Sequence, residues 1–330
     1  MSKTTIFSGI QPSGNLHIGN YIGMITQMVA RQNPKETMLL GIVDLHAITV
    51  PQDPKELCEK CLQLAALYIA CGIDPKQSKI LIQSENPDHA YLAWIFNCLV
   101  PMGWMERMTQ FKDKSNNQGE RTSLGLFSYP TLMAADVLLY DTPYVPVGGD
   151  QAQHIELTRD IAERFNRQFG EVFVLPKAMI LKQAARVMSL QNPSAKMSKS
   201  DKDPAGTINL LDSADEIRKK VRRAVTDSGT EILYRTDKPA ISNLLVIYSK
   251  LSGDSLDALE QKYNSSTYAQ FKQELAEVIV STLKPIQDKY YELRAEKDYL
   301  DKILDEGRDF AREISSKKIA QVKKAVGLGR

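Results

Sequence analysis

The sequence has few cysteines, no long apolar run and no repeated or low-complexity segment. Only four of its 330 residues are cysteines. Cys58 and Cys61 form one CxxC pair, but no second pair and no His-x-x-x-His motif follows it. A zinc site and a disulfide framework are therefore disfavoured, and we expect reduced thiols and no metal bound by the protein. No apolar stretch approaches the ~18 residues of a membrane helix, and residues 1–10 lack a signal-peptide core. We expect a cytoplasmic protein without a membrane segment.

The charge of the chain is nearly balanced. Forty-two basic residues face 40 acidic ones, for a net charge of +2, which neither requires nor excludes a polyanionic partner. Basic residues are concentrated in residues 218–223 (RKKVRR) and in the tail at 315–330. A solvated helix face explains each stretch more simply than a contact with nucleic acid, and both interpretations stay open.

Residues 4–180 alternate short apolar stretches with amphipathic ones. This alternation predicts an α/β fold, a doubly wound parallel sheet with helices on both faces. Strands are expected at residues 4–10, 79–85, 144–151 and 171–176, and a strand that runs into a loop at 37–50. Helices are expected at 16–32, 54–72, 89–100, 129–141 and 154–170. After Asp201 nearly every segment has helical periodicity, and Ser213 with Glu216 fits a capping box. The sequence therefore predicts an α/β part followed by an all-helical part.

The first strand is followed by a glycine-rich turn at residues 8–23, SGIQPSGNLHIGNYIG. It matches neither GxGxxG nor the P-loop pattern GxxxxGK[ST]. A glycine still allows a nucleotide to approach the backbone closely, and the carboxyl ends of parallel strands are where ligands bind in such sheets. His17 and Asn20 could each donate a hydrogen bond to a ligand oxygen there. A tight turn with a histidine on a helix surface is the alternative.

Two motifs lie far apart in the chain, HIGN at 17–20 and KMSKS at 196–200. Together, after an α/β array, they resemble the two signatures of the class I aminoacyl-tRNA synthetases. Other stretches extend the resemblance to the bacterial tryptophanyl-tRNA synthetases over essentially the whole chain: residues 43–50, 106–115, 129–140, 145–166, 224–228 and 241–245. The resemblance implies a tryptophan–tRNA ligase that activates L-tryptophan with ATP, releases pyrophosphate and transfers tryptophan to the 3′ end of tRNA(Trp).

The resemblance also implies which residues bind ATP. Lys196 and Lys199, with Lys114, are expected to stabilise the charge that moves onto the departing pyrophosphate, with His17 and Asn20 as further catalytic residues. Contacts made by a mobile loop only near the transition state would raise the rate rather than ground-state binding. The remaining expected ATP contacts are Gln11, Pro12, Ser13, Gly19, Gly148, Gly149, Asp150, Val187 (through its backbone), Met197, Ser198 and Ser200.

Asp136 is the candidate for reading the amino-acid side chain. It is the lone carboxylate in the apolar stretch TLMAADVLLY, where it is costly unless a donor pairs with it. The indole N–H is such a donor, and a pairing with a neighbouring tyrosine or backbone group is the alternative. The resemblance places further tryptophan contacts at Phe7, His46, Tyr129, Met133 and Gln151.

The sequence departs from the family pattern at two positions. Gly149 stands where a Glu is usual, which puts a second carboxylate there in doubt, and Leu45 stands where many relatives have Gln. One rival interpretation is a tyrosyl-tRNA synthetase, but Phe7 provides no hydroxyl where those enzymes have a tyrosine. The other rival is a catalytically inactive relative that only binds nucleic acid.

The resemblance further implies a domain division and partners. Residues 1–194 would form the Rossmann-like catalytic domain, to which 294–330 return, and 195–293 would form the helical domain that binds the anticodon. A homodimer is expected. Mg²⁺ would arrive with ATP, held by its phosphates.

Overall fold

The described strands all run parallel to their neighbours. The computed structural model describes residues 4–109, 123–148, 151–180, 186–198 and 203–330. The strands pair as β1 (Thr4–Ile10), β2 (Glu36–Ile42) and β3 (Ser78–Ile82) in one sheet, and as β4 (Tyr144–Val147) with β5 (Lys177–Ile180) in another. β4 also contacts β1, so the two sheets are adjacent. The parallel arrangement predicted from the sequence is confirmed.

Helices separate these strands, as the periodicity predicted. They are α1 (Ile18–Asn20), the π-helical η1 (Tyr21–Ile25), α2 (Thr26–Arg31), α3 (Asp44–Ala47), α4 (Pro54–Ala70), η2 (Gln83–Glu85), α5 (Asp88–Leu99), α6 (Met102–Glu106), α8 (Leu124–Leu138) and α9 (Ala152–Phe169). The helix expected at 16–32 thus forms as three consecutive pieces.

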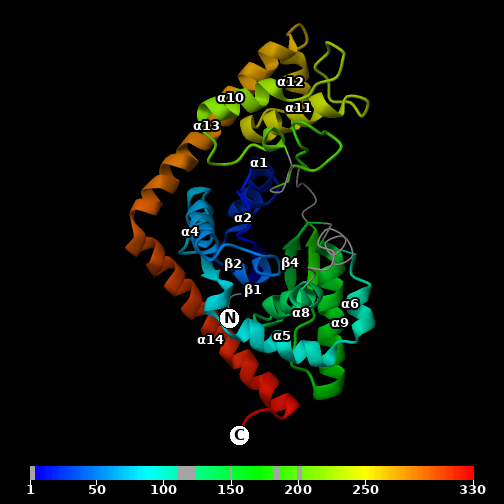
Figure 1. Ribbon diagram of the computed structural model, residues 1–330, viewed down its shortest axis with the longest axis vertical. Coiled ribbons are helices and arrows are strands. Elements are labelled where there is room, and N and C mark those ends of the chain that lie inside the picture. The colour runs from blue at the N-terminus through cyan, green and yellow to red at the C-terminus, as the bar shows by residue number, and fades with distance from the viewer. Residues whose placement is uncertain (1–3, 110–122, 149–150, 181–185, 199–202) are drawn as a thin grey trace.

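Successive side chains of the central strand β2 enter two different apolar cores. Leu40 and Ile42 pack in one core with residues of η1 and α4, whereas Leu39 packs in the other with residues of α5, α8 and α9. Adjacent residues of a strand point to opposite faces of the sheet. A strand that is apolar on both faces therefore needs helices packed against both faces. This is the layered arrangement seen in Figure 1.

The strand expected at residues 171–176 is wrong, because the strand β5 begins at Lys177. The backbone N–H groups of Val172 and Phe173 instead donate to the side-chain oxygen of Asn166, at 3.0 and 2.9 Å. The Phe173 ring is buried edge-on against Phe165 and Phe96. The apolar run that resembled a strand is therefore a loop with a core-packed ring.

The second part of the chain is helical, as predicted. It contains η5 (Pro204–Gly206), α10 (Ala214–Arg223), α11 (Pro239–Ser252), α12 (Leu256–Lys262), α13 (Tyr268–Ala295) and α14 (Lys297–Val326). The capping box of Ser213 and Glu216 is confirmed at the start of α10. One apolar cluster nevertheless runs from Leu40 of β2 to Val221 of α10 and Phe271 of α13. The domain boundaries near residues 194 and 294 stay a prediction.

The last helix, α14, packs against β3 and also contacts α4 and α5. Its Leu304 joins the first apolar core and its Ala311 the second, so the helix lies across the end of the sheet. Figure 1 shows α13 descending from the group α10–α12 and α14 continuing along the same side of the molecule. Covering an edge strand with a helix protects its unpaired backbone groups from other chains.

None of the described helices combines the length and apolarity needed to cross a membrane. The four cysteines are all free.

We predict that Gly307→Ala lowers the stability of the protein. A Cβ atom at Gly307 would lie 1.8 Å from the carbonyl oxygen of Ile80 in β3, so α14 would have to move off the strand. Overpacking of this kind costs about 1–3 kcal/mol or more. Urea unfolding measures the change. Gly103→Ala is the matched control, because a Cβ on this glycine of α6 would meet no atom within 4 Å. Equal stability of the two variants would show that α14 does not pack this closely.

Candidate active site

One cavity of about 900 Å³ opens at the carboxyl ends of β1 and β4. Its walls come from β1, the turn that follows it, α1, α8, β4 and the segment 186–197. Fourteen of the residues predicted from the sequence line it: Phe7, Gln11, His17, Gly19, Asn20, His46, Tyr129, Met133, Asp136, Gly148, Gln151, Val187, Lys196 and Met197. Residues from widely separated parts of the sequence thus share one cavity.

The other predicted residues fall into two groups. Pro12, Ser13 and Ser198 are described but are not among the residues that line the cavity. Five more lie outside the described residues: Lys114, Gly149, Asp150, Lys199 and Ser200.

Asp136 on α8 is a buried carboxylate held by three side-chain donors. Nε2 of His46 lies 2.9 Å from its Oδ2. Nδ1 of His89 lies 2.6 Å from its Oδ1, and Nε2 of Gln83 donates to the same oxygen at 2.7 Å. Burial raises the pKa of Asp136, but hydrogen bonds with His46 and His89 outweigh it and lower this pKa to about 2. The carboxylate is therefore ionised at neutral pH.

The sequence pattern identified Asp136 and His46 but missed Gln83 and His89. Both missed residues are fully buried, and Gln83 comes directly after β3. The available signal was a polar stretch, QSENPDH, at the carboxyl end of a buried strand. That signal marks a site in a parallel sheet, but it does not say which side chain faces which.

Aromatic and aliphatic side chains surround Asp136. The ring of Phe7 is stacked on Tyr140, with 5.6 Å between centroids. The ring of Tyr129 meets His46 edge-on, and its hydroxyl lies 2.7 Å from Nε2 of His154. Val43, Met133, Val137, Val145 and Val147 complete this part of the lining. The arrangement suits a flat apolar ring that carries one hydrogen-bond donor.

The start of the first helix lies close to the segment at Val187. A Cβ atom at Gly19 would be 3.0 Å from Nδ1 of His17 and 3.4 Å from Cβ of Val187. His17 is buried, and its backbone N–H donates to the side chain of Asn20 at 3.1 Å. Any side chain at position 19 would crowd His17 and the segment at Val187, so glycine keeps the backbone of the first helix accessible from the cavity.

Residues 187–197 form a small hairpin that brings Lys196 to the cavity. Met188 and Lys196 form an isolated antiparallel bridge, and the N–H of Met197 donates to the carbonyl of Val187 at 3.0 Å. Met197 is buried and anchors the segment, while Lys196 is exposed at the cavity. Arg186, which the sequence pattern missed, adds another cation to the lining.

Asn243 on α11 holds this hairpin in place. Its side chain accepts from the N–H of Met188 at 2.8 Å and donates to the carbonyl of Met188 at 2.9 Å. The stretch ISNLL contributed to the family resemblance, but no role was assigned to its asparagine. The signal was a polar residue inside an apolar helical stretch, where it needs a partner.

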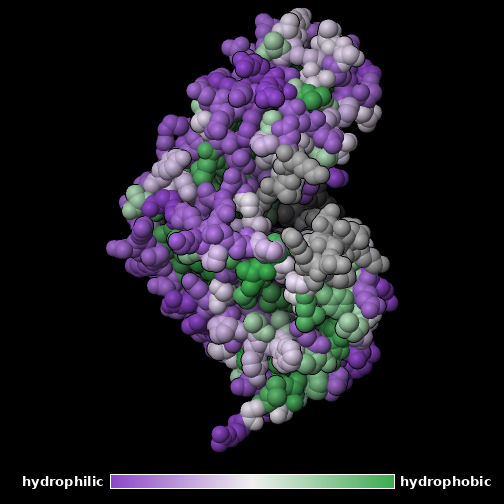
Figure 2. Space-filling view, in the orientation of Figure 1, coloured by the Kyte–Doolittle hydropathy of each residue, from purple (hydrophilic) through white to green (hydrophobic). Residues whose placement is uncertain are grey.

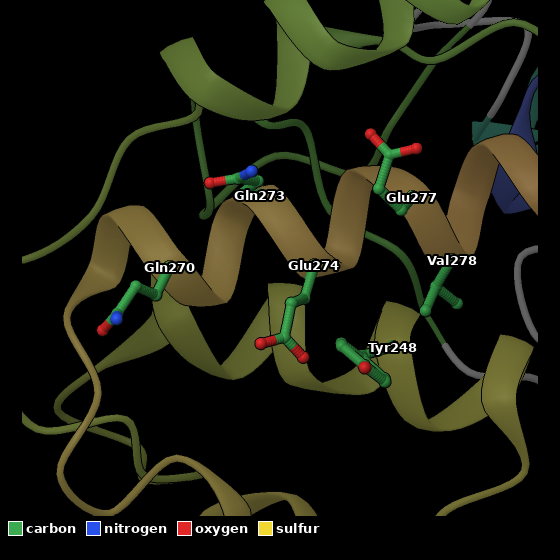
Figure 3. Close-up of a pocket in the computed structure, with 6 residues that line it drawn as sticks. All are labelled: Tyr248, Gln270, Gln273, Glu274, Glu277 and Val278. Carbon is green, nitrogen blue, oxygen red and sulfur yellow. The ribbon is translucent and has the colours of Figure 1, made fainter.

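A second cavity, of about 430 Å³, lies on the helical part between α11 and α13. Figure 3 shows Glu274 of α13 directed toward Tyr248 of α11. Lys262 bridges them, at 2.8 Å from a Glu274 oxygen and 3.0 Å from the Tyr248 hydroxyl. Because these polar groups already satisfy one another, the first cavity is the better candidate for an active site.

Comparison with known proteins gives consistent results. The family model for class I tRNA synthetases (W and Y) matches residues 1–284. A tryptophan–tRNA ligase from Wolinella succinogenes is 49% identical over 328 residues, which are 99% of this chain and 100% of that protein.

Two solved structures are also similar along their whole length. The tryptophanyl-tRNA synthetase from Mycoplasma pneumoniae has a TM-score of 0.89 and 33% identity, and the match covers 100% of this chain and 99% of that one. The enzyme from Campylobacter jejuni, complexed with ADP and tryptophan, has a TM-score of 0.86 and 39% identity, covering 98% and 100%. The predicted fold class, a Rossmann-like part with a helical part, is confirmed.

We predict that Asp136 makes the stability of the protein sensitive to acid. Its pKa is lowered from 3.8 to about 2 in the folded state, so its contribution is complete above about pH 4 and is lost as the pH falls toward 2. Asp136→Asn lacks this titration. The difference between its free energy of unfolding and that of wild type should therefore shrink by roughly 2 kcal/mol as the pH falls through that window. Urea unfolding from pH 6 to pH 2 follows the change.

Asp301→Asn is the control for this measurement, because Asp301 is exposed on α14. The free energy of unfolding of Asp301→Asn should stay close to that of wild type at every pH. A deficit of Asp136→Asn that does not change with pH would show that Asp136 is not an ionised, stabilising group.

Proposed function

Because the chain belongs to the class I tRNA synthetases (W and Y), we propose that it activates L-tryptophan with ATP and transfers it to the 3′ end of tRNA(Trp). The enzyme is a tryptophan–tRNA ligase. The first step forms tryptophanyl-adenylate and pyrophosphate, and in the second the terminal ribose of the tRNA takes the acyl group.

The observation that carries this proposal is the ionised Asp136 inside an aromatic and aliphatic cavity. From the described residues, two hydrogen bonds reach its Oδ1, but a single one reaches Oδ2. A carboxylate oxygen has room for another donor, and the indole N–H donates and cannot accept. An amino acid without this donor would leave the buried acceptor unpaired, which discriminates better than shape alone.

Tyrosine fits the cavity less well. Its phenol would need a partner for both the proton and the oxygen, whereas Phe7 presents a ring without a hydroxyl at the wall. Met133 and the valines of β4 likewise offer no polar group. A catalytically inactive relative is also disfavoured, because Lys196 and His17 both line the cavity and have the chemistry that the first step needs.

Charge stabilisation is the main task of the nucleotide end. The tryptophan carboxylate attacks the α-phosphorus, and negative charge moves onto the departing pyrophosphate. Lys196 is the described lysine in the lining, and Arg186 adds another cation. We propose that Lys196, Lys199 and Lys114 bind the phosphates, with His17 and Asn20 at the reacting oxygens.

The remaining nucleotide contacts are also proposals. We propose that Gly19 contacts the adenosine and that Val187 contacts the adenine through its backbone, because both residues line the cavity. We propose further ATP contacts at Gln11, Pro12, Ser13, Gly148, Gly149, Asp150, Met197, Ser198 and Ser200, and a contact of Gln151 with the amino-acid ammonium.

Mg²⁺ would be held by the ATP phosphates. Among the described residues, no group of three or more His, Cys, Asp or Glu side chains is placed to hold a metal ion. We therefore propose no protein site for the ion, and no step above depends on one.

The basic helix α10 is a weaker candidate for tRNA contact than its sequence suggested. Arg218 is paired with Glu277 at 2.7 Å, and Lys220 with Asp212 at 2.5 Å. In the tail, Lys318 is buried and paired with Asp141 at 2.7 Å. Arg218, Lys220 and Lys318 therefore already have partners, which argues against a tRNA contact for these three cations.

An exposed apolar surface supports the homodimer. Figure 2 shows larger hydrophobic areas over the lower body than over the helical part at the top. Trp94 of α5 is 70% exposed and Leu124 of α8 is 79% exposed. Ile48, Tyr91 and Met102 are further exposed apolar residues of the same half. Apolar patches of this kind mark interfaces, and we propose that a second copy covers this one.

A cytoplasmic location follows from the use of tRNA in protein synthesis.

Tryptophan should drive exchange of pyrophosphate into ATP, and no other common amino acid should do so comparably. The reason is the acceptor position on Asp136: phenylalanine has no donor for it, and tyrosine would pair it while leaving its own phenol oxygen without a donor. The assay compares kcat/KM for all twenty amino acids with the purified protein. A higher kcat/KM for tyrosine would overturn the assignment, and exchange with no amino acid would favour the inactive relative.

Lys196→Ala should lower kcat for this exchange by roughly ten- to a hundredfold, since a charge-assisted contact is worth about 1.5–3 kcal/mol. Its KM for tryptophan should change little, because Lys196 is proposed to contact the ATP phosphates and not the amino acid. Lys302→Ala, an exposed lysine of α14, is the control. Equal kcat values for the two variants would make Lys196 an ordinary surface residue.

A further inference from the structure

A chain of buried polar side chains lies behind Asp136, on the side away from the cavity. Its members are His89, Tyr140, Asn86 and Ser315, each no more than 2% exposed. None of them lines the cavity. Buried polar groups are costly unless they are paired, so a chain this long within the core needs an explanation.

The hydrogen bonds of this chain are continuous from α14 to the carboxylate. The side-chain amide of Asn86 donates to the oxygen of Ser315 at 3.0 Å and to the hydroxyl oxygen of Tyr140 at 3.2 Å. The Tyr140 hydroxyl lies 2.7 Å from Nε2 of His89, and Nδ1 of His89 lies 2.6 Å from Asp136. Ser315 donates in turn to a carboxylate oxygen of Asp88 at 2.6 Å.

One arrangement of protons satisfies every contact. The ionised Asp136 only accepts, so Nδ1 of His89 carries a proton toward it. The Tyr140 oxygen already accepts from Asn86, and its own proton then has Nε2 of His89 as acceptor. Burial raises the pKa of Tyr140, so the hydroxyl keeps that proton. Tyr140 thereby selects the tautomer of His89 that donates to Asp136.

This selection determines how Asp136 faces the cavity. His89 and Gln83 both donate to Oδ1, and His46 donates to Oδ2. With Oδ1 held from behind, the acceptor position left on Oδ2 is the one that a ligand can use. If His89 presented its unprotonated nitrogen instead, the carboxylate would be repelled and would turn.

We propose that Tyr140, acting through His89, is a positioning residue for recognition of the indole N–H, and that Ser315 anchors this chain from the C-terminal helix. The inference rests on the proposed specificity for tryptophan. Ser315 on α14 lies nearly 180 residues after Asp136 in the sequence. The packing of α14 against the sheet would therefore influence which amino acid the site selects.

Tyr140→Phe tests the proposal with little disturbance, because the ring and its stacking on Phe7 are kept. The assay measures pyrophosphate exchange with tryptophan and with its benzothiophene analogue, in which sulfur replaces the indole N–H. The ratio of kcat/KM for tryptophan to that for the analogue should fall about tenfold relative to wild type. The reason is that the lost hydroxyl no longer fixes His89, which donates to the ionised Asp136. The KM for ATP should stay within about twofold. Ser315→Ala should lower the ratio in the same direction by less, because it is further along the chain.

Two further variants define the range of the measurement. Asp136→Ala should abolish the preference for tryptophan over the analogue and gives the lower limit. Tyr68→Phe is the matched control, because the hydroxyl of Tyr68 on α4 is buried and has no hydrogen-bond partner among the described residues. Its ratio should equal that of wild type.

The outcomes separate the inference from the function on which it rests. If Tyr140→Phe raised KM for tryptophan and the analogue equally, or lowered only the melting temperature, the hydroxyl would be structural and the proposal would be wrong. If the wild type itself did not prefer tryptophan to the analogue, or showed no exchange with tryptophan, the proposed function would fail first.

Discussion

A buried negative charge organises the centre of this molecule. Asp136 is 2% exposed, and its ionised form persists because His46, Gln83 and His89 surround it with N–H donors. A carboxylate at this depth is tolerable only with such partners, since losing one would leave an uncompensated charge in the core. The donors come from α3, η2 and α5, the segments that follow β2 and β3. The charge therefore ties together the segments that follow β2 and β3, and both Asp136 and His46 line the cavity.

The C-terminal helix connects this centre to the outer parts of the fold. α14 covers β3 closely enough that Gly307 has no room for a side chain, and one of its serines ends the hydrogen-bonded chain behind Asp136. A single non-helical residue, Glu296, separates α14 from α13, which packs on α10 and α11. Two consecutive helices thus connect the helical part with the sheet and with the hydrogen-bonded chain behind Asp136. A change in the position of α10–α13 would therefore be transmitted through α14 to β3 of the sheet.

The cavity is assembled from segments that are far apart in the chain. Its end at Asp136 is built on β1, α8 and β4, and its other end places the first helix against the hairpin at 187–197. Asn243 of α11 positions that hairpin through two backbone hydrogen bonds. Each end thus depends on a polar side chain that is buried outside the lining, His89 at one end and Asn243 at the other. Such residues determine the shape of a site without contacting a ligand.

The sequence alone determined the alternation of strands and helices, the helical second part, the capping box at Ser213 and the burial of Asp136. These follow from local periodicity, end signals and the cost of an isolated charge among apolar residues, which neighbouring residues decide. Tertiary structure alone decided that Phe173 packs as a ring in a loop, that Arg218 is already paired with Glu277, and that His89 and Tyr140 stand behind the carboxylate. Those outcomes depend on contacts between segments distant in sequence, and no local pattern specifies which distant side chain will be the partner.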